Sequence, residues 1–334
     1  MDQERLHLIY EKWPDHFKSA SGIKIAPDHD SDYYDMVVFC GMGGSATSCD
    51  ILHDLMNAHS NMMSMVVRGS TLPDSVGKKS LIVVNSVSGN TIETVSAMQE
   101  ALKRGSEVIC VSSGGKLKEL TEAEGQKHVM IPNLSLPRAS LPYMIMPGLR
   151  IIDPFLENSM NHSIKNLYSH LLEIKKNISS RTSEKTNISK QVASFMRDGF
   201  AFCFASPYLL SVATRFKNSL NENAKVHCLR ESVLEASHNE IVPFTYPYEG
   251  LAPKVVLLEW VHDNAITKER FRKVKSFFSK VNQPLIEVYS TEDKLVTALL
   301  ASIYILDYAT IYMAISRKID PSPTPAIDIL KGTL

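Results

Sequence analysis

The chain contains 334 residues, of which 44% are hydrophobic and 22% are charged, and its 36 lysines and arginines balance 36 aspartates and glutamates. This balance gives no electrostatic footprint for a nucleic acid or an anionic membrane surface, so we expect neither as a partner. The length suggests about two domains, each large enough to bury its own hydrophobic core.

In the first half of the chain, short apolar runs rich in β-branched residues alternate with segments suited to helices. The pattern predicts strands at 36–40, 63–67, 81–85, 107–111 and 128–131, and a helix at 92–104 that Gly105 ends. Such alternation is typical of βαβ units with right-handed crossovers, which build a parallel sheet covered by helices on both faces.

Two loops rich in serine and glycine follow the first and third of these strands, GMGGSA at 41–46 and SVSGNT at 86–91. A strand, a loop and a helix in this order direct backbone N–H groups and the helix dipole at an anion. Glycine lets the backbone approach the ligand, and the serine and threonine hydroxyls can add hydrogen bonds. Because neither loop has the lysine of the GxxxxGK[ST] motif, we expect a sugar phosphate monoester rather than a nucleoside triphosphate.

These loops allow two other interpretations. A dinucleotide site would need GxGxxG and an acidic residue about twenty positions later. The glycines are instead Gly41, Gly43 and Gly44, and the next strand is followed by Arg68, which disfavours such a site. Alternatively, each loop is only a tight strand-to-helix turn. Two loops in succession favour a shared ligand, because ligands of open α/β sheets bind at the carboxyl ends of the strands.

Residues 136–148, LPRASLPYMIMPG, surround Arg138 with three prolines. Proline fixes φ, so this segment could present Arg138 as a preorganised cation to a developing oxyanion. The alternative is an arginine in a proline-rich surface linker.

After Pro154 the composition turns polar, and residues 158–198 suit helices without a strand pattern. Strands are predicted again at 200–205, 225–229, 254–260 and 284–289, with helical segments between them. We therefore expect an α/β fold of two doubly wound domains, each with a mainly parallel sheet flanked by helices. The expected parts are an amino-terminal domain at 1–153 with the two loops, a connecting helical region at 154–198 and a carboxy-terminal domain at 199–334.

Polar residues that could perform chemistry follow the helical segment predicted at 208–220. Glu222 stands between two asparagines, and His238 could act as a general acid or base because imidazole titrates near neutrality. The alternatives are a solvated carboxylate at a helix end and one of 11 histidines without a catalytic role. The tail at 321–334 is proline-rich, then amphipathic, and carries Lys331, although a frayed terminus would have the same pattern.

Residues 295–316 are apolar enough to raise the question of a membrane span. Asp307 lies near their centre and small residues recur through them, which favours a buried helix. The five cysteines show no CxxC or zinc-ligand spacing and mostly lie in strand-like runs, which predicts core thiols and no metal site. The odd cysteine count, and an amino terminus without a signal-peptide pattern, indicate a cytoplasmic protein.

Taken in order, the motifs resemble those of one family. GMGGSA, SVSGNT, PRASLP at 137–142, KNSLNENAK at 217–225, SHNEIV at 237–242 and IDILK at 327–331 are similar to the bifunctional phosphoglucose/phosphomannose isomerases of archaeal type, which are built from two SIS (sugar isomerase) domains. The resemblance covers nearly the whole chain. It implies that the protein interconverts glucose 6-phosphate and mannose 6-phosphate with fructose 6-phosphate through a cis-enediol(ate), without a metal or another cofactor.

The resemblance also implies roles for single residues. Glu222 would be the base at C2, His238 would open the sugar ring, and Arg138 would stabilise the enediolate. Lys331 would assist ring opening and hold the sugar, and Thr324 would leave room for both C2 epimers. The phosphate would be held by Gly44, Ser45, Ser86, Ser88 and Thr91. In this family the histidine reaches the active site of the neighbouring subunit, which implies a homodimer, with the helix at 295–316 as part of its interface.

Three positions depart from the family pattern. Val87 stands where a tyrosine is usual, which bears on phosphate affinity, and Ser140 and Cys49 replace smaller or apolar residues. Two alternatives to the implied function remain: a sensor or regulator that binds a phosphosugar without turnover, and an SIS isomerase of a pentose, heptose or amino-sugar phosphate. Glu222, His238 and Arg138 together favour an enzyme, because a sensor would not need them.

Overall fold

The computed structural model describes residues 2–25, 30–246 and 253–332. The chain divides into two compact units: unit N comprises residues 12–169, and unit C comprises residues 1–11 and 170–334. This division differs from the expected boundaries at 153 and 198. The expected connecting region is not a separate body, since the division falls within helix α7 (Asn161–Ile178).

The first helix belongs to unit C because it packs on the long helix α12. Helix α1 (Leu6–Glu11) contacts α12 (Leu295–Ser316), and the buried hydroxyl of Tyr304 donates a hydrogen bond of 3.0 Å to the carbonyl of Tyr10. No local sequence pattern predicts this contact, because it joins residues 294 positions apart.

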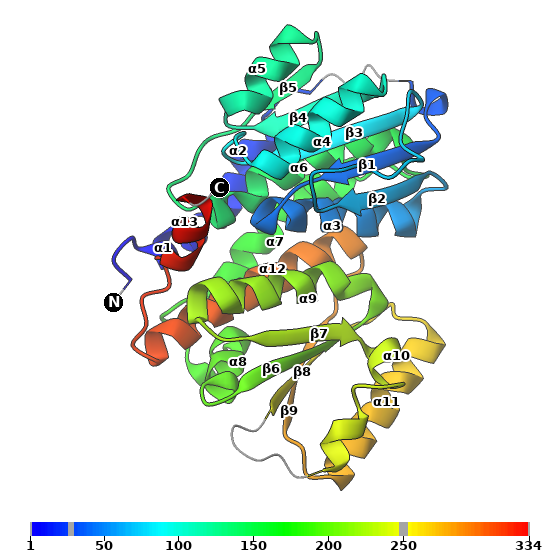
Figure 1. The fold of residues 1–334 in the computed structure, drawn as a ribbon. Coiled ribbons are helices and arrows are strands. Elements are labelled where there is room, and N and C mark those ends of the chain that lie inside the picture. The colour runs from blue at the N-terminus through cyan, green and yellow to red at the C-terminus, as the bar shows by residue number, and fades with distance from the viewer. Residues whose placement is uncertain (1, 26–29, 247–252, 333–334) are drawn as a thin grey trace. The chain divides into compact units, whose positions relative to one another are not determined.

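Unit N is built on a parallel five-stranded sheet with the strand order β2-β1-β3-β4-β5 (Figure 1). The strands are β1 (Met36–Cys40), β2 (Met63–Val67), β3 (Ser80–Ser86), β4 (Glu107–Ser112) and β5 (Lys127–Met130). Helices α2 (Trp13–Ser21), α3 (Gly43–His59) and α6 (Leu141–Ile152) pack on one face, and α4 (Ile92–Lys103) and α5 (Gly115–Ala123) on the other. All five predicted strands are present, with ends within one residue of those expected.

The packing of unit N explains why its central strands read as continuous apolar runs. Every residue of β1 and β3 is buried, because helices cover both faces of the sheet. On the face covered by α4 and α5, Val38, Ile82 and Val108 of three neighbouring strands form one layer with Met98 and Leu117. This layer holds the strands in register and fixes where the loops at their carboxyl ends emerge.

Unit C contains a parallel four-stranded sheet with the order β7-β6-β8-β9. Its strands are β6 (Phe200–Ala205), β7 (Cys228–Ser232), β8 (Pro253–Trp260) and β9 (Leu285–Ser290). Helices α8 (Ile188–Met196), α9 (Leu210–Ser219) and α12 pack on one face, while α10 (Val233–Ala236) and α11 (Ala265–Lys280) cover a cluster with Phe204, Phe244 and Phe278 on the other. Two parallel sheets flanked by helices confirm the predicted fold class.

One predicted strand began too early. The expected strand at 225–229 is observed as β7, which starts at Cys228. Lys225 has a φ of +57° and ends a π-helix, Leu220–Ala224, by donating its N–H to the carbonyl of Leu220. A residue in this left-handed conformation turns the chain, so the strand starts only after the turn.

Helix α12 is a core element of unit C. It spans 22 residues, and 83% of its most apolar 18-residue window is buried. The buried Asp307 near its centre pairs with Arg215 of α9, with 2.8 Å between Oδ2 and Nη2. Helices α1, α8 and α9 pack against α12, and most of its residues are buried within unit C.

All five cysteines are free and buried, as predicted for core thiols. Burial raises the pKa of Cys40 and of Cys228 to about 12, so these thiols stay protonated and unreactive.

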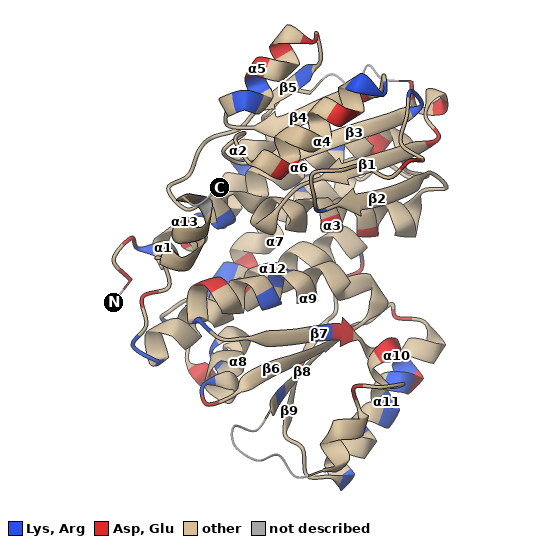
Figure 2. Cartoon of the chain, viewed as in Figure 1, with Lys and Arg blue, Asp and Glu red and all other residues tan. Residues whose placement is uncertain are grey.

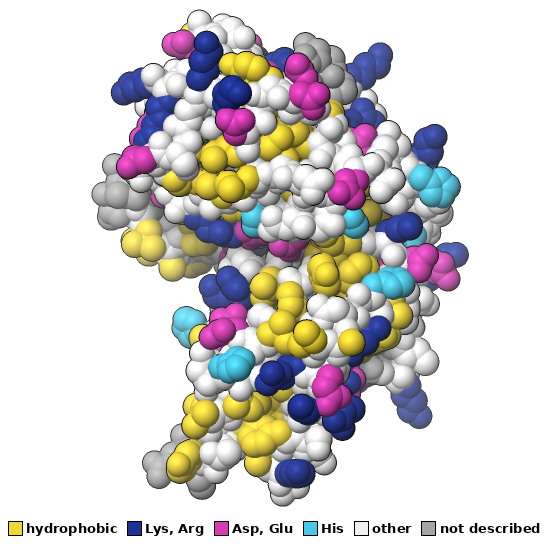
Figure 3. Space-filling model, turned by 90° about the vertical axis from the view of Figure 1, so that its right-hand side faces the viewer, with side chains coloured by type: hydrophobic (Ala, Val, Ile, Leu, Met, Phe, Trp, Pro, Cys, Tyr) yellow, Lys and Arg dark blue, Asp and Glu magenta, His cyan; other side chains and the backbone are white. Residues whose placement is uncertain are grey.

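Charges of both signs lie on the surface. Helix α5 carries two lysines and two glutamates, whereas α11 carries six basic residues and a single glutamate, Glu269 (Figure 2), and both signs are interspersed on the face drawn in Figure 3.

Candidate active site

The two serine- and glycine-rich loops leave neighbouring strands of unit N. Strands β1 and β3 pair directly, with Cys40 opposite Val84, and the order of the sheet reverses between them. In open α/β sheets this switch point is where ligands bind, in the crevice outside the carboxyl ends of the strands. The structure therefore brings 41–46 and 86–91 to the same edge, as the sequence predicted.

The first loop opens helix α3 toward this crevice. Gly41 is packed so tightly that a Cβ would lie 3.0 Å from the amide nitrogen of Ala46, and Gly43 has a φ of +53°. The residue before the helix, Met42, makes no side-chain cap. Gly44 and Ser45 lie half-buried in the first turn. The amide of Ser45 already donates to the carbonyl of Met42 at 3.1 Å, so the amide of Gly44 and the hydroxyl of Ser45 are the groups that can turn to an anion.

The second loop combines backbone strain with hydroxyl groups. Gly89 has a φ of +68°, and its N–H donates to the carbonyl of Ser86 at 3.1 Å. The Ser86 hydroxyl, on a side chain only 2% exposed, lies 3.1 Å from that of Thr91 and shapes the loop from inside. Ser88 is exposed and Thr91 half-buried, so their hydroxyls are the ones placed to meet a ligand.

A third loop, which the sequence analysis missed, clamps the second one. Residues 112–115, SSGG, run from the last residue of β4 to the first residue of α5 and pack against the SVSGNT loop. The amide of Ser113 donates to the carbonyl of Val87 at 2.9 Å, and the amide of Leu117 to that of Gly89 at 3.0 Å. The available signal was the same as for the other two loops: serine and glycine directly behind an apolar strand.

A buried side-chain bridge also links the first loop to β3. Asn85 Nδ2 donates to Ser48 Oγ at 2.7 Å, and Ser48 Oγ donates to the carbonyl of Ser45 at 2.6 Å. Asn85 and Ser48 are fully buried, so they position the loop rather than contact a ligand. No sequence motif marks either residue.

The three departures from the family pattern are all buried. Val87 is 4% exposed and offers its carbonyl to Ser113, so its side chain packs inward. Cys49 and Ser140 have no exposed surface. None of the three side chains is therefore exposed to a ligand in the crevice.

Arg138 lies on a short 3-10 helix, Pro137–Ser140, directly before α6. Its side chain is 5% exposed, and the indole N–H of Trp13 holds the carbonyl of Ala139 at 3.0 Å. The alternative of an arginine in a surface linker is therefore wrong. The segment is stiff and buried, as preorganisation requires.

The remaining predicted residues lie in unit C, on separate elements. Glu222 is half-buried in the π-helix Leu220–Ala224, not at a simple helix end. His238 is exposed in the turn after α10, and its N–H donates to the carbonyl of Glu235 at 2.9 Å. Thr324 is half-buried and precedes helix α13 (Pro325–Gly332). The side chain of Lys331, in α13, falls outside the described residues.

The switch point of unit C, between β6 and β8, has a different chemistry. Ser206 donates to the buried carboxylate of Asp263, which also accepts the amide of Trp260 at 3.0 Å. Burial raises the pKa of Asp263, although both hydrogen bonds oppose that change. The negative charge of Asp263 at this edge would repel a bound phosphate, so the cradle of unit N is the better phosphate site.

A surface depression and the placement of possible metal ligands leave the cradle of unit N as the candidate phosphate site. A depression of about 440 Å³, lined by residues including Tyr33, Lys78 and Lys127, lies at the amino ends of the unit N strands, opposite to the loops. Among residues 2–25, 30–246 and 253–332, no group of three or more His, Cys, Asp or Glu side chains is placed to hold a metal ion.

Comparison with known proteins adds three findings. Residues 185–334 match the family model of the bacterial phospho-glucose isomerase C-terminal SIS domain. The bifunctional phosphoglucose/phosphomannose isomerase of Caldicellulosiruptor bescii is 29% identical over 316 residues, which cover 94% of this chain and 93% of that protein. The D-glucosamine-6-phosphate 4-epimerase of Sulfolobus acidocaldarius is 30% identical over 241 residues, which cover 70% of this chain and 71% of that protein.

The fold is shared with solved structures. A glucose-6-phosphate isomerase like protein from Thermus thermophilus superposes with a TM-score of 0.66 at 15% identity, over 100% of this chain and 96% of that one. At this identity the likeness shows the fold alone.

Proposed function

Because the chain belongs to the bifunctional phosphoglucose/phosphomannose isomerase family of SIS-domain proteins, we propose that it interconverts glucose 6-phosphate and mannose 6-phosphate with fructose 6-phosphate. The observation that carries the proposal is the anion cradle at the β1/β3 switch point of unit N. Its uncapped helix ends and its serine and threonine hydroxyls suit a single phosphate group. Gly44, Ser45, Ser88 and Thr91 are its proposed ligands, and Ser86 shapes the loop that carries them.

The proposed base is Glu222. Aldose–ketose isomerisation moves a proton between C1 and C2, and one carboxylate can take the proton from one carbon and return it to the other. Glu222 is half-buried on a π-helix, a geometry frequent at functional sites. The stiffly held Arg138 would meet the negative charge that develops on the enediolate oxygen.

Ring opening needs a separate acid or base, because glucose 6-phosphate is mostly cyclic. We assign this step to His238, whose exposed side chain can exchange protons with solvent, with Lys331 assisting and holding the sugar. Thr324, at the start of α13, would leave room for both epimers at C2. Binding energy from the phosphate, far from the reacting carbons, orients the substrate for these steps.

A homodimer that shares His238 across its interface is part of the proposal. The exposure of His238 is compatible with a role toward a second chain. A cytoplasmic location is also proposed, since five free buried thiols suit a reducing compartment.

A second candidate function acts at another carbon. The relative from Sulfolobus acidocaldarius is named a D-glucosamine-6-phosphate 4-epimerase, so an amino-sugar phosphate epimerised at C4 is the main competing substrate. A sensor that binds a phosphosugar without turnover is a third alternative, because the cradle alone would serve it.

The test is turnover of the purified protein with glucose 6-phosphate, mannose 6-phosphate and glucosamine 6-phosphate in parallel. Fructose 6-phosphate from both of the first two would support the proposal, and a C4 epimer from the third alone would establish the competing function. Glu222→Gln should lower kcat by about 10³-fold while a sugar phosphate still raises the melting temperature. Glu119→Gln, at an exposed carboxylate of α5, is the control and should leave kcat unchanged.

The shared histidine has its own test. Mixing inactive Glu222→Gln and His238→Gln chains should restore part of the activity if one chain's histidine serves the other chain's site. Full wild-type activity in a monomer would refute the sharing.

A further inference from the structure

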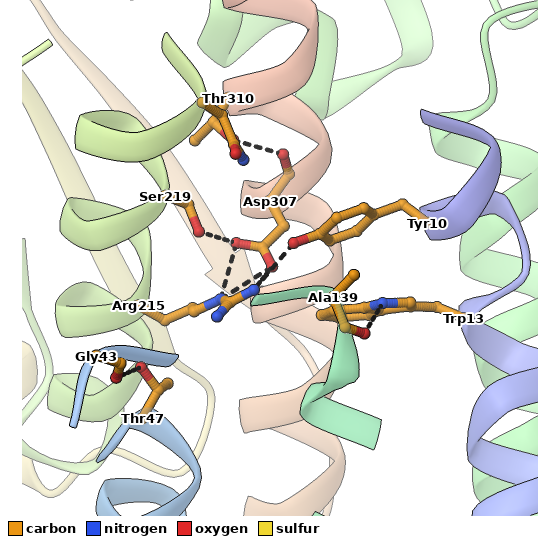
Figure 4. A network of polar contacts seen from close by, with 10 residues as sticks. Tyr10, Trp13, Gly43, Thr47, Ala139, Arg215, Ser219, Asp307 and Thr310 are labelled. Carbon is orange, nitrogen blue, oxygen red and sulfur yellow. Dashed lines mark hydrogen bonds and ion pairs between the residues drawn. The ribbon is translucent and has the colours of Figure 1, made fainter. Parts of the chain in front are cut away.

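A buried polar network in unit C connects helices α9 and α12 to the π-helix that carries the proposed base, Glu222. Arg215 of α9 and Asp307 of α12 form its centre: Arg215 Nε donates to both carboxylate oxygens at 3.2 and 3.0 Å, and Nη2 donates to one of them at 2.8 Å. Ser219 Oγ donates to Asp307 at 2.6 Å, and Arg215 Nη2 donates to the hydroxyl of Tyr10 at 2.9 Å (Figure 4). The four side chains are at most 2% exposed.

The network extends from α12 to the π-helix that carries Glu222. Thr310 Oγ1 donates to the carbonyl of Asp307 at 2.7 Å and accepts from Asn223 Nδ2 at 2.9 Å. Both side chains are fully buried, and Asn223 directly follows Glu222. At the end of the π-helix, Arg317 Nη1 donates to the carbonyl of Ala224 at 2.7 Å. Helix α12 and the residue that follows it thus hold the π-helix at two successive positions.

A π-helix turn needs such outside support, because its hydrogen bonds are less regular than those of an α-helix and such turns are rare. This turn ends at Lys225, which adopts a left-handed φ of +57° without being glycine. The contacts of Asn223 with Thr310 and of Ala224 with Arg317 therefore fix the backbone from which the Glu222 side chain extends.

The charge at the centre of the network is stable. Burial alone would lower the pKa of Arg215, but Asp307, Tyr10 and Glu222 together raise it, so the guanidinium stays protonated. A buried ion pair with its hydrogen-bonding groups satisfied adds little to stability, and in some proteins it specifies a geometry.

We propose that Asn223 and Thr310 are positioning residues that direct the Glu222 carboxylate at C1 and C2 of the sugar, with the Arg215–Asp307 pair as their anchor. The inference rests on the proposed function of Glu222. None of these residues needs to touch the substrate.

The test removes one hydroxyl group. Thr310→Val keeps the shape of the side chain but removes the hydroxyl that accepts the hydrogen bond from Asn223 Nδ2. Displacing a reacting group by about an ångström can cost about 100-fold, so we expect kcat to fall about 10- to 100-fold while KM changes little. Thr310→Ser restores the hydroxyl and should recover most of kcat.

Thr267→Val is the matched control. Thr267 of α11 is also fully buried in unit C, and its hydroxyl has no hydrogen-bond partner among the described residues. Its loss should leave kcat at the wild-type value. Asp307→Asn is the less useful variant, because it takes the counter-charge from a buried guanidinium and endangers folding.

A labelling experiment separates positioning from simple destabilisation. Glucose 6-phosphate carrying deuterium at C2 is converted, and the label found at C1 of fructose 6-phosphate is compared with the label lost to water. A carboxylate that is no longer held should lose more label, so Thr310→Val should transfer less of it than the wild type and Thr267→Val. A variant that is only less stable would keep the wild-type ratio.

The possible results are distinguishable. Equal kcat and equal label transfer in Thr310→Val and Thr267→Val would overturn the positioning role while the isomerase function stands. Absence of turnover in the wild-type protein would instead overturn the proposed function, and this inference with it.

Discussion

Gly89 is the position at which one methyl group should disrupt the phosphate cradle. A Cβ at Gly89 would lie 1.8 Å from the carbonyl oxygen of Gly114, whereas real Cβ contacts stay beyond 3.0 Å. The 112–115 loop would have to retreat by at least 1.2 Å, the difference between 3.0 and 1.8 Å. That movement would break the hydrogen bonds from Ser113 to Val87 and from Leu117 to Gly89.

The size of the effect follows from two contributions. An alanine in the left-handed region costs about 1–2 kcal/mol, and two lost hydrogen bonds cost about 1 kcal/mol each. Gly89→Ala should therefore lower the free energy of unfolding of unit N by about 3–4 kcal/mol. Gly125→Ala is the matched control, because Gly125 has a similar φ of +63° but a Cβ there would meet nothing within 4 Å. It should cost only about 1–2 kcal/mol.

The assay is urea unfolding of both variants, together with their affinity for a sugar phosphate. Gly89→Ala should be about 2 kcal/mol less stable than Gly125→Ala and should bind the sugar phosphate about tenfold more weakly. Gly125→Ala should bind it like the wild type. Equal losses of stability and equal affinities in the two variants would refute the reasoning, since they would show that the close approach of the two loops does not matter.

Three further predictions concern other parts of the chain. Burial, and to a lesser degree Arg68, lowers the pKa of His53, so the unfolded chain binds a proton at this residue more readily than the folded chain. The melting temperature should therefore fall as the pH drops below about 6.5, and it should fall less in His53→Gln. Trp13→Phe keeps an aromatic side chain but removes the indole N–H that bonds Ala139, so kcat should fall with the looser Arg138 segment while affinity for inorganic phosphate is unchanged. Lys318→Gly, at an exposed residue with a φ of +60° after α12, should raise the free energy of unfolding by about 1 kcal/mol in urea titrations.

The strands and the first two loops of unit N could be predicted because their signals are local. A strand buried on both faces reads as an apolar run wherever it lies, and β1 and β3 are buried throughout. The glycines of the loops mark positive φ angles, as at Gly43 and Gly89. Their meeting at one edge followed from the rule that parallel strands end on the same side of a sheet.

Other features had weaker or misleading local signals. The residues at 225–229 read as a strand, but the turn at Lys225 depends on the π-helix before it, which no sequence pattern marks. The third loop at 112–115 had the same serine and glycine composition as the other two, but its function as a clamp depends on packing against Gly89.

The sequence by itself determined the fold class, the parallel sheets, the serine- and glycine-rich loops and the family. Those properties depend on hydrophobic periodicity and on backbone chemistry over a few neighbouring residues. Only the tertiary structure decided that Asp263 occupies the corresponding edge of unit C, and that Arg215 joins Asp307 and Tyr10 behind the π-helix of Glu222. The last two contacts join residues 92 and 205 positions apart, and burial of their charges is a consequence of how whole helices pack.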